Sequence, residues 1–211
     1  SGAAAPWSLF VGAAGFLDLG RTTPTDPRTP FDLASVTKPF VATTVARLAA
    51  ADALALEAPL SDFLPELRGV ATGAATLELL LAHRAGLEPH LELFRPLMAG
   101  RTTRLDEAVR GAALARREGC AGPPSASGYA PVYSDLGYFL VGRALERHLR
   151  RPLDELVAEQ VTGPLGLSVG SARQWSRAVT GFRARVAPTE HVPWRGGTLR
   201  GVVHDDNAWA L

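Results

Sequence analysis

The sequence predicts an α/β fold of the α+β type, because strand patterns lie towards its two ends and helical patterns fill its middle. Residues 7–13 form a short, largely apolar run closed by Gly15, which is typical of a buried strand, and residues 16–19 are expected to return beside it. Weaker strand patterns recur at residues 181–186 and 198–203. Between these ends, apolar residues repeat at helical spacing, so a helix-rich middle is expected.

The first long helix is predicted to begin near Ser35, after a proline- and threonine-rich loop at residues 21–30. Pro39 fixes this start, because proline is tolerated in the first turn of a helix, where backbone N–H groups have no intrahelical partner. Ser35 is therefore expected at the positive end of the helix dipole, and Lys38, one turn on, projects from the same face. The apolar face of this helix consists of Val36, Phe40, Val41, Val45 and Leu48.

Caps and helix breakers place the remaining helices. The predicted helices are residues 76–83 with a Thr76 cap and a stop at Gly86, residues 91–98, residues 103–117 with Asp106 completing a capping box on Thr103, a helix capped by Ser134 that ends at residues 151–152, and a last helix from Pro152 to Gly163. The loop that leads into Ser134, residues 119–131, is rich in Gly, Pro and Ser.

Lys38 is the only lysine in the sequence, and every other basic residue except histidine is arginine. Lysine differs from arginine in being able to lose its proton near neutral pH, which proton-transfer chemistry requires. Ser35 and Lys38 form an S-x-x-K pattern, in which an amine one helical turn away can activate a serine hydroxyl. Composition alone places a serine three positions before a lysine roughly one time in twenty, so a solvated lysine beside a capping serine stays the alternative.

A second candidate group stands at residues 133–135, where a loop meets a helix. Tyr133 can act as a general acid or base when a nearby cation lowers the pKa of its phenol. The alternative is a tyrosine packed beneath the capping Ser134. Among the histidines, His83 is expected to hydrogen-bond near a helix end, and the sequence identifies no partner for His90.

Four segments in order resemble the superfamily of class C β-lactamases, low-molecular-weight penicillin-binding proteins and related esterases and D-amino-acid peptidases. They are FDLASVTK at 31–38, LLAHRAGL at 80–87, YSDLGY at 133–138 and GVVHDDNA at 201–208. The resemblance implies a β-lactamase/transpeptidase-like fold, with an antiparallel sheet flanked by helices and a helical lobe beside it. It implies a single domain over residues 1–211, with N-terminal strands and the nucleophile helix at 1–50, the helical lobe at 51–165 and a segment returning to the sheet at 166–211.

The resemblance also implies a serine hydrolase that works through an acyl-enzyme. Ser35 would attack a carbonyl, Lys38 and Tyr133 would shuttle its proton, and the Ser35 N–H would form half of an oxyanion hole. Asp135 stands where the family more often has Asn, and it would orient substrate. Because an ionised Asp135 only accepts hydrogen bonds and favours the ammonium form of Lys38, an esterase or DD-peptidase is favoured over an efficient β-lactamase.

The family's third motif, usually Lys-Thr-Gly or His-x-Gly on a core strand, is expected downstream of residue 211. The C-terminal sheet strands are therefore expected to be missing from this chain, which would make it incomplete. This leaves two alternatives to an active hydrolase: a catalytically silent ligand-binding or interaction domain of the same fold, and an inactive fragment of a longer hydrolase. A helical structural domain with accidental motifs would require all four matches to be coincidence.

The charge and composition of the chain limit the kinds of partner and ligand that it is expected to bind. The net charge is +1, with 22 basic and 21 acidic side chains interspersed, so no nucleic-acid partner is expected. No apolar run approaches the roughly 20 residues of a membrane span, and no cofactor is implied. His204 lies in an Asp/Asn-rich stretch that is more typical of a turn than of a metal site, so no metal is expected.

The expected substrates are small esters, amides or peptidoglycan peptides. No signal peptide is visible, so the bacterial cytoplasm and the periplasm both stay open, as does the oligomeric state.

Overall fold

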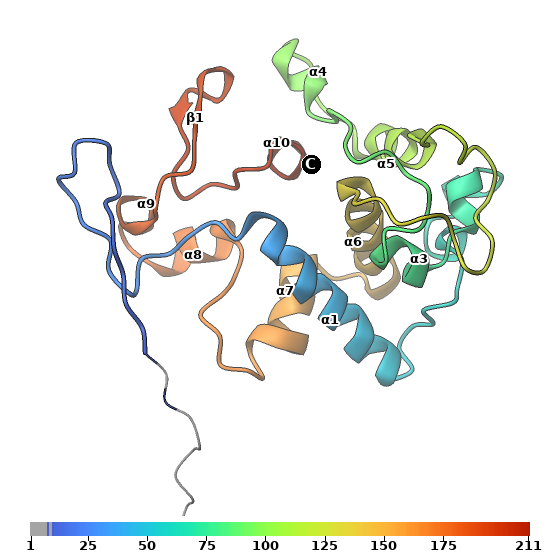
Figure 1. Cartoon of the computed structure of the whole chain (residues 1–211), viewed down its shortest axis with the longest axis horizontal. Helices are drawn as coiled ribbons and strands as arrows, with labels where there is room; N and C mark the ends of the chain where they lie inside the picture. The colour runs from blue at the N-terminus through green and yellow to red at the C-terminus, as the bar shows by residue number, and fades with distance from the viewer. Residues whose placement is uncertain (1–7, 9) are drawn as a thin grey trace, which may run out of the picture. The chain divides into compact units, whose positions relative to one another are not determined.

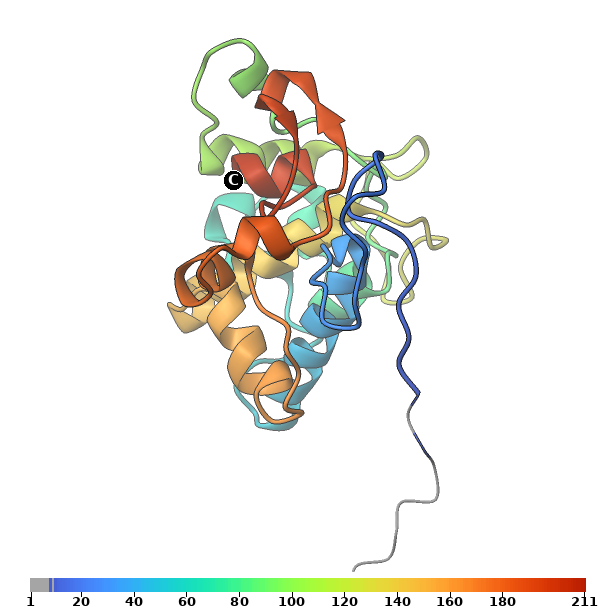
Figure 2. The ribbon, with the colours of Figure 1, turned by 90° about the vertical axis from the view of Figure 1, so that its left-hand side faces the viewer.

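The computed structural model describes residue 8 and residues 10–211, which divide into two compact units. The larger unit comprises residues 34–171 and 205–211, and the smaller unit comprises residues 172–204 with the described part of 1–33. Figure 1 and Figure 2 show the chain from two directions. Each unit is described by itself below.

The larger unit consists of helices and helical turns joined by loops, with two isolated β-bridges, Pro59 to Thr76 and Leu87 to Arg116. Its elements are the 3-10 turn η1 (Ala34–Val36), α1 (Thr37–Ala50), α2 (Leu60–Phe63), the 3-10 turns η2 (Pro65–Leu67) and η3 (Ala71–Ala74), α3 (Leu77–Leu81), α4 (Arg95–Met98), α5 (Leu105–Leu114), α6 (Asp135–Leu149), α7 (Leu153–Val157), the π-helical turn η4 (Ala158–Thr162) and α10 (Asp206–Ala210).

Helix α6 is the centre of the larger unit, packing against α1, α2, α3, α5 and α7. Its buried face repeats at helical spacing, with Leu136, Leu140, Val141, Ala144 and Leu145 each at most 1% exposed. Gly137 lets α3 come close, because a Cβ at this position would lie 3.2 Å from the carbonyl oxygen of Leu80. The apolar face of α6 therefore fixes where its first turn lies relative to the end of α3.

Helix α1 follows the predicted pattern closely. Val41, Val45 and Leu48 are buried, and Thr44 in the same stripe bonds its hydroxyl to the carbonyl of Phe40. The prediction that Val36 belongs to this face is wrong, because Val36 is 57% exposed. Val36 lies in η1, where the tighter 3-10 turn points it away from the stripe that α1 buries.

Of two predicted side-chain caps at helix starts, the structure confirms one and contradicts the other. The Thr76 cap of α3 is confirmed, since its hydroxyl accepts a hydrogen bond from the Leu79 N–H. The capping box at Thr103 is wrong, because α5 begins at Leu105 without a side-chain cap. The Asp106 carboxylate instead forms an ion pair with Arg104.

The smaller unit contains the described sheet, two antiparallel strands β1 (His191–Val192) and β2 (Gly197–Thr198) joined by the 3-10 turn η5 (Pro193–Arg195). Its helices are α8 (Ala172–Ala178) and α9 (Phe182–Arg185). The chain near residue 30 is tied to this unit by a bond from the Ala187 N–H to the Pro30 carbonyl. A second bond runs from the His204 N–H to the Asp32 carboxylate.

The strand predictions in the smaller unit are largely wrong. Of the predicted strand at 7–13, residues 7 and 9 lie outside the described residues, while residue 8 and residues 10–13 form no strand and Phe10 is 93% exposed. Residues 16–19 contribute one isolated bridge, from Phe16 to Pro24. Within 181–186 the chain forms α9 (Phe182–Arg185), and only Thr198 of 198–203 is in a strand.

The physical reason is that a strand is stable only when its backbone groups pair with a neighbour. An apolar residue can instead be buried by local helical packing. Phe182 does this, because its ring stacks on Trp175 of α8 with the centroids 5.9 Å apart. Strand-like composition in these segments therefore yields helix and turn where local contacts are available.

We expect Leu140→Ala to lower the free energy of unfolding by about 2–5 kcal/mol, because it opens a cavity at the centre of the α6 core. Leu140 is 0% exposed, whereas Leu114 at the end of α5 is 53% exposed. Urea denaturation followed by circular dichroism measures the change, with Leu114→Ala as the matched control. A loss below about 1 kcal/mol for Leu140→Ala would show that α6 is not the centre of the core.

Candidate active site

Ser35 is the middle residue of η1, which leads directly into α1, so the predicted start of the first long helix near this residue is confirmed. The residue before it, Ala34, has a φ of +44°, which is uncommon for a residue with a Cβ. Strained backbone of this kind is concentrated at functional sites, where it orients a side chain. Ser35 is exposed, and its position before the first turn of α1 gives it the positive end of the helix dipole.

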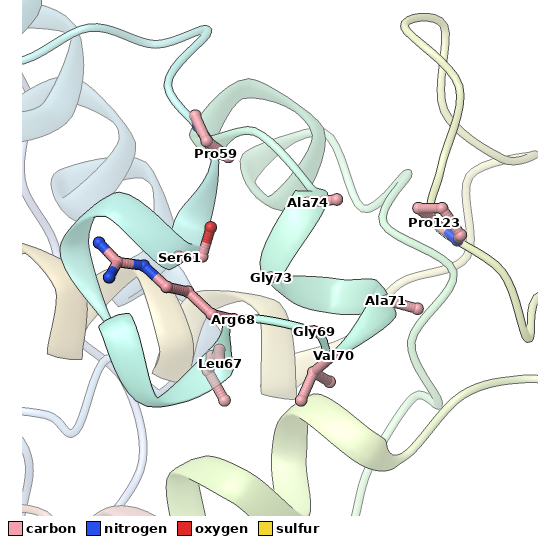
Figure 3. Close-up of a pocket in the computed structure, with 10 residues that line it drawn as sticks. All are labelled: Pro59, Ser61, Leu67, Arg68, Gly69, Val70, Ala71, Gly73, Ala74 and Pro123. Carbon is pink, nitrogen blue, oxygen red and sulfur yellow. The ribbon is translucent and has the colours of Figure 1, made fainter.

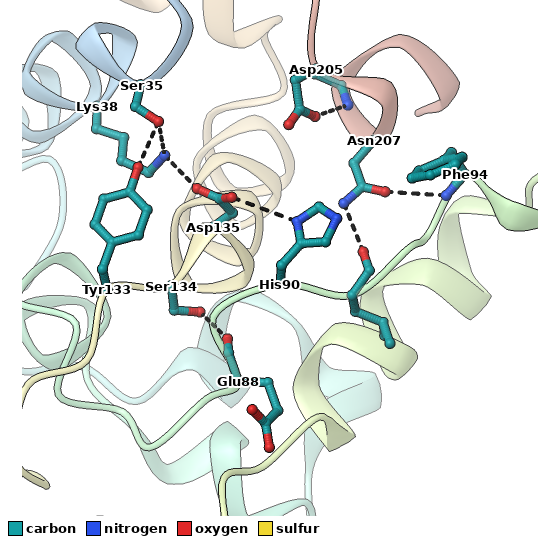
Figure 4. A network of polar contacts seen from close by, with 12 residues as sticks. Ser35, Lys38, Glu88, His90, Phe94, Tyr133, Ser134, Asp135, Asp205 and Asn207 are labelled. Carbon is teal, nitrogen blue, oxygen red and sulfur yellow. Dashed lines mark hydrogen bonds and ion pairs between the residues drawn. The ribbon is translucent and has the colours of Figure 1, made fainter.

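Two side chains converge on the Ser35 hydroxyl, as Figure 4 shows. The Tyr133 phenol donates a hydrogen bond to Ser35 Oγ at 2.6 Å. The Lys38 Nζ donates to the same oxygen at 3.1 Å. Lys38 also lies over the Tyr133 ring, 4.8 Å from its centroid. A hydroxyl, a phenol and an amine are thus in direct contact, as transfer of the serine proton requires.

Asp135 completes this group from the first turn of α6. Its Oδ1 lies 2.7 Å from Lys38 Nζ, and the two side chains are 35% and 16% exposed. Burial alone would lower the pKa of the Lys38 ammonium, but hydrogen bonds and charge attraction from Asp135 and Tyr133 outweigh it and raise that pKa. In the state described, Lys38 is therefore an ammonium held between Asp135 and Ser35. The structure brings all four predicted site residues together.

The loop that carries Tyr133 is held by His83, which follows α3 with a φ of +58°. Its Nδ1 accepts a hydrogen bond from the Ser134 N–H at 3.1 Å, and its ring lies 4.8 Å from the Tyr133 ring between centroids. The expectation that His83 bonds near a helix end is confirmed, and the helix it serves is α6. Because the acceptor Nδ1 must be unprotonated, this bond requires neutral His83.

Ser134 occupies the N-cap position of α6, but its side chain does not cap the helix. Its Oγ instead donates to the carbonyl of Glu88 at 2.6 Å. The neighbouring Asp135 N–H donates to the carbonyl of Pro89 at 2.9 Å. The start of α6 is thereby bonded to the loop after α3, which orders both segments beside Lys38.

His90 in that loop was not identified from the sequence as a site residue. Its Nδ1 lies 3.6 Å from Asp135 Oδ2, on the carboxylate oxygen that Lys38 does not contact, and its side chain is 44% exposed. His90 and Asp135 are 45 residues apart in the sequence, and no local pattern connects them. Tyr138, one turn into α6, also faces Lys38, at 5.7 Å from its ring centroid.

A separate hollow lies elsewhere in the larger unit, with a volume of about 550 Å³. Figure 3 shows its lining, which is mostly apolar and includes Arg68; the lining residues are Pro59, Ser61, Leu67, Arg68, Gly69, Val70, Ala71, Gly73, Ala74 and Pro123. None of the four predicted site residues lines it. Within the described part of the chain, no group of three or more His, Cys, Asp or Glu residues could hold a metal ion.

The chain belongs to the β-lactamase family, because the family model described as Beta-lactamase matches residues 7–199. The fold is the β-lactamase/transpeptidase-like fold, here helix-rich with a small antiparallel sheet. Of the described helices, none is long and apolar enough to cross a membrane.

Within this comparison, the chain is similar to an esterase, an aminopeptidase and an amidase. Esterase EstB of Burkholderia gladioli is 36% identical over 174 residues, which cover 75% of this chain and 42% of the esterase. A D-aminopeptidase of Cereibacter sphaeroides is 29% identical over 157 residues, covering 74% of this chain and 29% of that protein. The crystal structure of D-amino acid amidase from Ochrobactrum anthropi has a TM-score of 0.64 at 23% identity, covering 85% of this chain and 47% of that one. The chain thus spans less than half the length of each of these proteins.

We expect acid to destabilise the protein through His83. Burial of the imidazole and the nearby Lys38 ammonium lower the pKa of His83, so below its ordinary value of about 6.5 the unfolded state binds more protons. Stability contributed by neutral His83 is therefore present above pH 6.5 and is lost as the pH falls from there. In His83→Asn, the amide oxygen can still accept from Ser134 and asparagine tolerates a positive φ, but the titration is removed.

Urea denaturation of both proteins between pH 7.5 and 5 tests this expectation. The wild type should lose stability more steeply than His83→Asn over this range. His191→Asn, at an exposed histidine in β1, is the matched control and should follow the wild-type slope. Equal slopes for the wild type and His83→Asn would contradict the prediction.

Proposed function

We propose that this protein is a serine acyl hydrolase that forms an acyl-enzyme on Ser35. The observation that carries the proposal is the double contact at Ser35 Oγ, from Tyr133 at 2.6 Å and from Lys38 at 3.1 Å. A serine hydroxyl is a weak nucleophile by itself, and a proton acceptor within hydrogen-bond distance makes it reactive. Both neighbours are residue types that can accept and return a proton.

In the acylation step, Ser35 Oγ forms a bond to the carbonyl carbon of the substrate and its proton moves to the Lys38–Tyr133 pair. The pair must first hold one proton fewer than an ammonium and a phenol together, either as ammonium and phenolate or as amine and phenol. When the tetrahedral intermediate collapses, the bond to the leaving group breaks and the pair returns the proton to it.

Deacylation repeats these steps with water. Water attacks the ester carbonyl of the acyl-enzyme, its proton moves to the pair, and the Ser35 oxygen leaves and recovers a proton. The Ser35 N–H, at the positive end of α1, would stabilise the oxyanion in both steps, supplying one of the two donors that such sites commonly use. No cofactor is needed for this sequence of steps.

For substrates, we infer small carboxylic esters or amides. The support is the similarity to a protein named an esterase and to one named a D-aminopeptidase. Peptidoglycan D-alanyl peptides and β-lactams contain the same reactive carbonyl chemistry. The ion pair between Asp135 and Lys38 argues against efficient β-lactam turnover, because Asp135 accepts hydrogen bonds without donating one to a substrate carbonyl. Asp135 is proposed to orient Lys38 and the bound substrate.

The alternative is a catalytically silent site that binds a ligand without turning it over. The observation in its favour is the same ion pair, since Asp135 holds Lys38 as an ammonium, which cannot accept a proton. The two functions differ in one measurable property, which is whether Ser35 becomes acylated.

We expect a fluorophosphonate to add covalently to Ser35, because an activated serine displaces fluoride from phosphorus. Intact mass spectrometry of the 22.3 kDa chain before and after incubation measures the adduct. Ser35→Ala should reduce labelling by roughly 10³-fold or more, while Ser61→Ala, at a serine that lines the separate hollow, should label like the wild type. An adduct that persists in Ser35→Ala, or no adduct in the wild type, would count against the acyl hydrolase.

We further expect Lys38→Arg to slow labelling by roughly 10²- to 10⁴-fold, because arginine keeps the positive charge but does not give up its proton. Stopped-flow or quenched labelling at pH 8 measures the rate, with circular dichroism as the check on folding. Arg47→Lys, the reverse exchange near the end of α1, is the matched control and should leave the rate unchanged. A Lys38→Arg rate within tenfold of the wild type would show that Lys38 supplies charge alone and Tyr133 takes the proton.

A further inference from the structure

The segment GVVHDDNA at residues 201–208 contributes one side chain, Asn207, to the larger unit in a way that the proposed mechanism does not use. Asn207 is 9% exposed, and both ends of its carboxamide are bonded. Oδ1 accepts from the Phe94 N–H at 3.1 Å, and Nδ2 donates to the Leu91 carbonyl at 2.8 Å. One side chain thus satisfies a backbone donor and a backbone acceptor of the same loop, as a neighbouring strand would.

Asn207 is itself held in place by the start of α10. The Asp205 side chain caps this helix, with Oδ1 accepting from the Ala208 N–H at 2.7 Å. A capped first turn fixes the backbone that carries Asn207, so its amide approaches the loop from a defined position. Figure 4 shows Asp205, Asn207 and Phe94 in this arrangement.

The loop is anchored at its other end by the start of α6. The carbonyl of Glu88 accepts from Ser134 Oγ at 2.6 Å, and that of Pro89 accepts from the Asp135 N–H at 2.9 Å. His90 is the residue between these two anchors and the Asn207 contacts. Its position is therefore determined from both sides, and its Nδ1 faces Asp135 Oδ2 at 3.6 Å.

We propose that Asn207 is a positioning residue for the site: it holds the loop so that His90 stays beside Asp135, and His90 thereby controls how strongly Asp135 holds the Lys38 ammonium. The effect of this role on catalysis rests on the proposed function, whereas the contacts themselves are independent of it. The Asp135 carboxylate has two oxygens, one on Lys38 and one facing His90. Positive charge on His90 competes for that carboxylate and repels the ammonium, which makes Lys38 easier to deprotonate.

The proposal predicts that the environment of Lys38 responds to the charge of His90. Histidine ordinarily changes charge between pH 5 and 8, whereas lysine does not. Besides His90, the titratable groups around Lys38 are Asp135, Tyr133, Tyr138 and His83. Glu88 and Glu92 lie on the same loop as His90. His83 also interacts with Lys38, so its contribution remains when His90 is replaced and serves as an internal reference.

The uniqueness of Lys38 makes this measurable without any enzyme assay. The chain labelled with ¹³C-lysine gives a single ε-CH₂ resonance, because the sequence contains one lysine. We expect the wild-type resonance to shift between pH 5 and 8 with a component that disappears in His90→Ala. Asn207→Leu should lose the same component, and the double variant should show no further change, since both substitutions act through one contact.

Two further variants guard against misfolding and non-specific effects. Asn207→Asp is nearly isosteric, keeps an acceptor for Phe94 and removes the donor to Leu91, so it should weaken the His90 component in a folded protein. Ala208→Gln, at an exposed position on the same helix, is the matched control and should behave like the wild type. Circular dichroism establishes that each variant is folded.

The outcomes separate this proposal from the proposed function. A His90 component that persists in folded Asn207→Leu and Asn207→Asp would overturn the positioning role of Asn207. A wild-type resonance with no component sensitive to His90→Ala would overturn the coupling of His90 to Lys38. If the resonance behaves as expected while Ser35 takes no fluorophosphonate, the positioning role stands and the acyl hydrolase fails. If Ser35 is labelled and the Lys38 resonance does not change with His90→Ala, the acyl hydrolase stands and the positioning role fails.

Discussion

The ion pair between Lys38 and Asp135 is the interaction on which the rest of the site depends. It joins the first turn of α1 to the first turn of α6, at 2.7 Å. A carboxylate at a helix N-terminus is favourable, whereas an ammonium at a helix N-terminus is not. The Asp135 carboxylate therefore offsets the unfavourable interaction of the Lys38 ammonium with the dipole of α1. Without Asp135, we expect the Lys38 side chain to point into water and away from Ser35.

The packing of α3 against α6 makes this pairing possible. The close approach at Gly137 sets the end of α3 beside the start of α6, and His83 and the loop after it then reach Ser134. From this junction, His83 and the carbonyls of Glu88 and Pro89 hold Ser134 and Asp135 in place. The core of α6 and the geometry of the site are thus consequences of the same buried leucine face.

The protonation state of Lys38 is set by opposing effects. Partial burial disfavours the charged amine, and the neighbouring carboxylate and phenol favour it, with the second effect the larger. A hydrolase needs a proton acceptor beside Ser35, so any group that draws Asp135 away from Lys38 would help the reaction. His90 is placed to do this, and Asn207 holds the loop that carries it. The protonation state of Lys38 therefore depends on the combined charges of its neighbours and not on any one residue.

The sequence by itself determined the parts that depend on local spacing. Pro39 fixed the start of α1, the S-x-x-K spacing placed Ser35 and Lys38 on one turn, and the loop-to-helix junction placed Tyr133 next to Asp135. Short-range sterics and helix periodicity are encoded within a few residues, so they can be inferred from the chain alone.

The tertiary structure decided what depends on distant partners. Strand patterns at residues 10–13 and 181–186 did not become strands, because a strand depends on a neighbour that its own residues do not specify. His83, His90 and Asn207 entered the site through contacts with residues far away in the sequence. A hydrogen bond between remote segments arises only when the core sets their distance, and the leucine face of α6 sets that distance here.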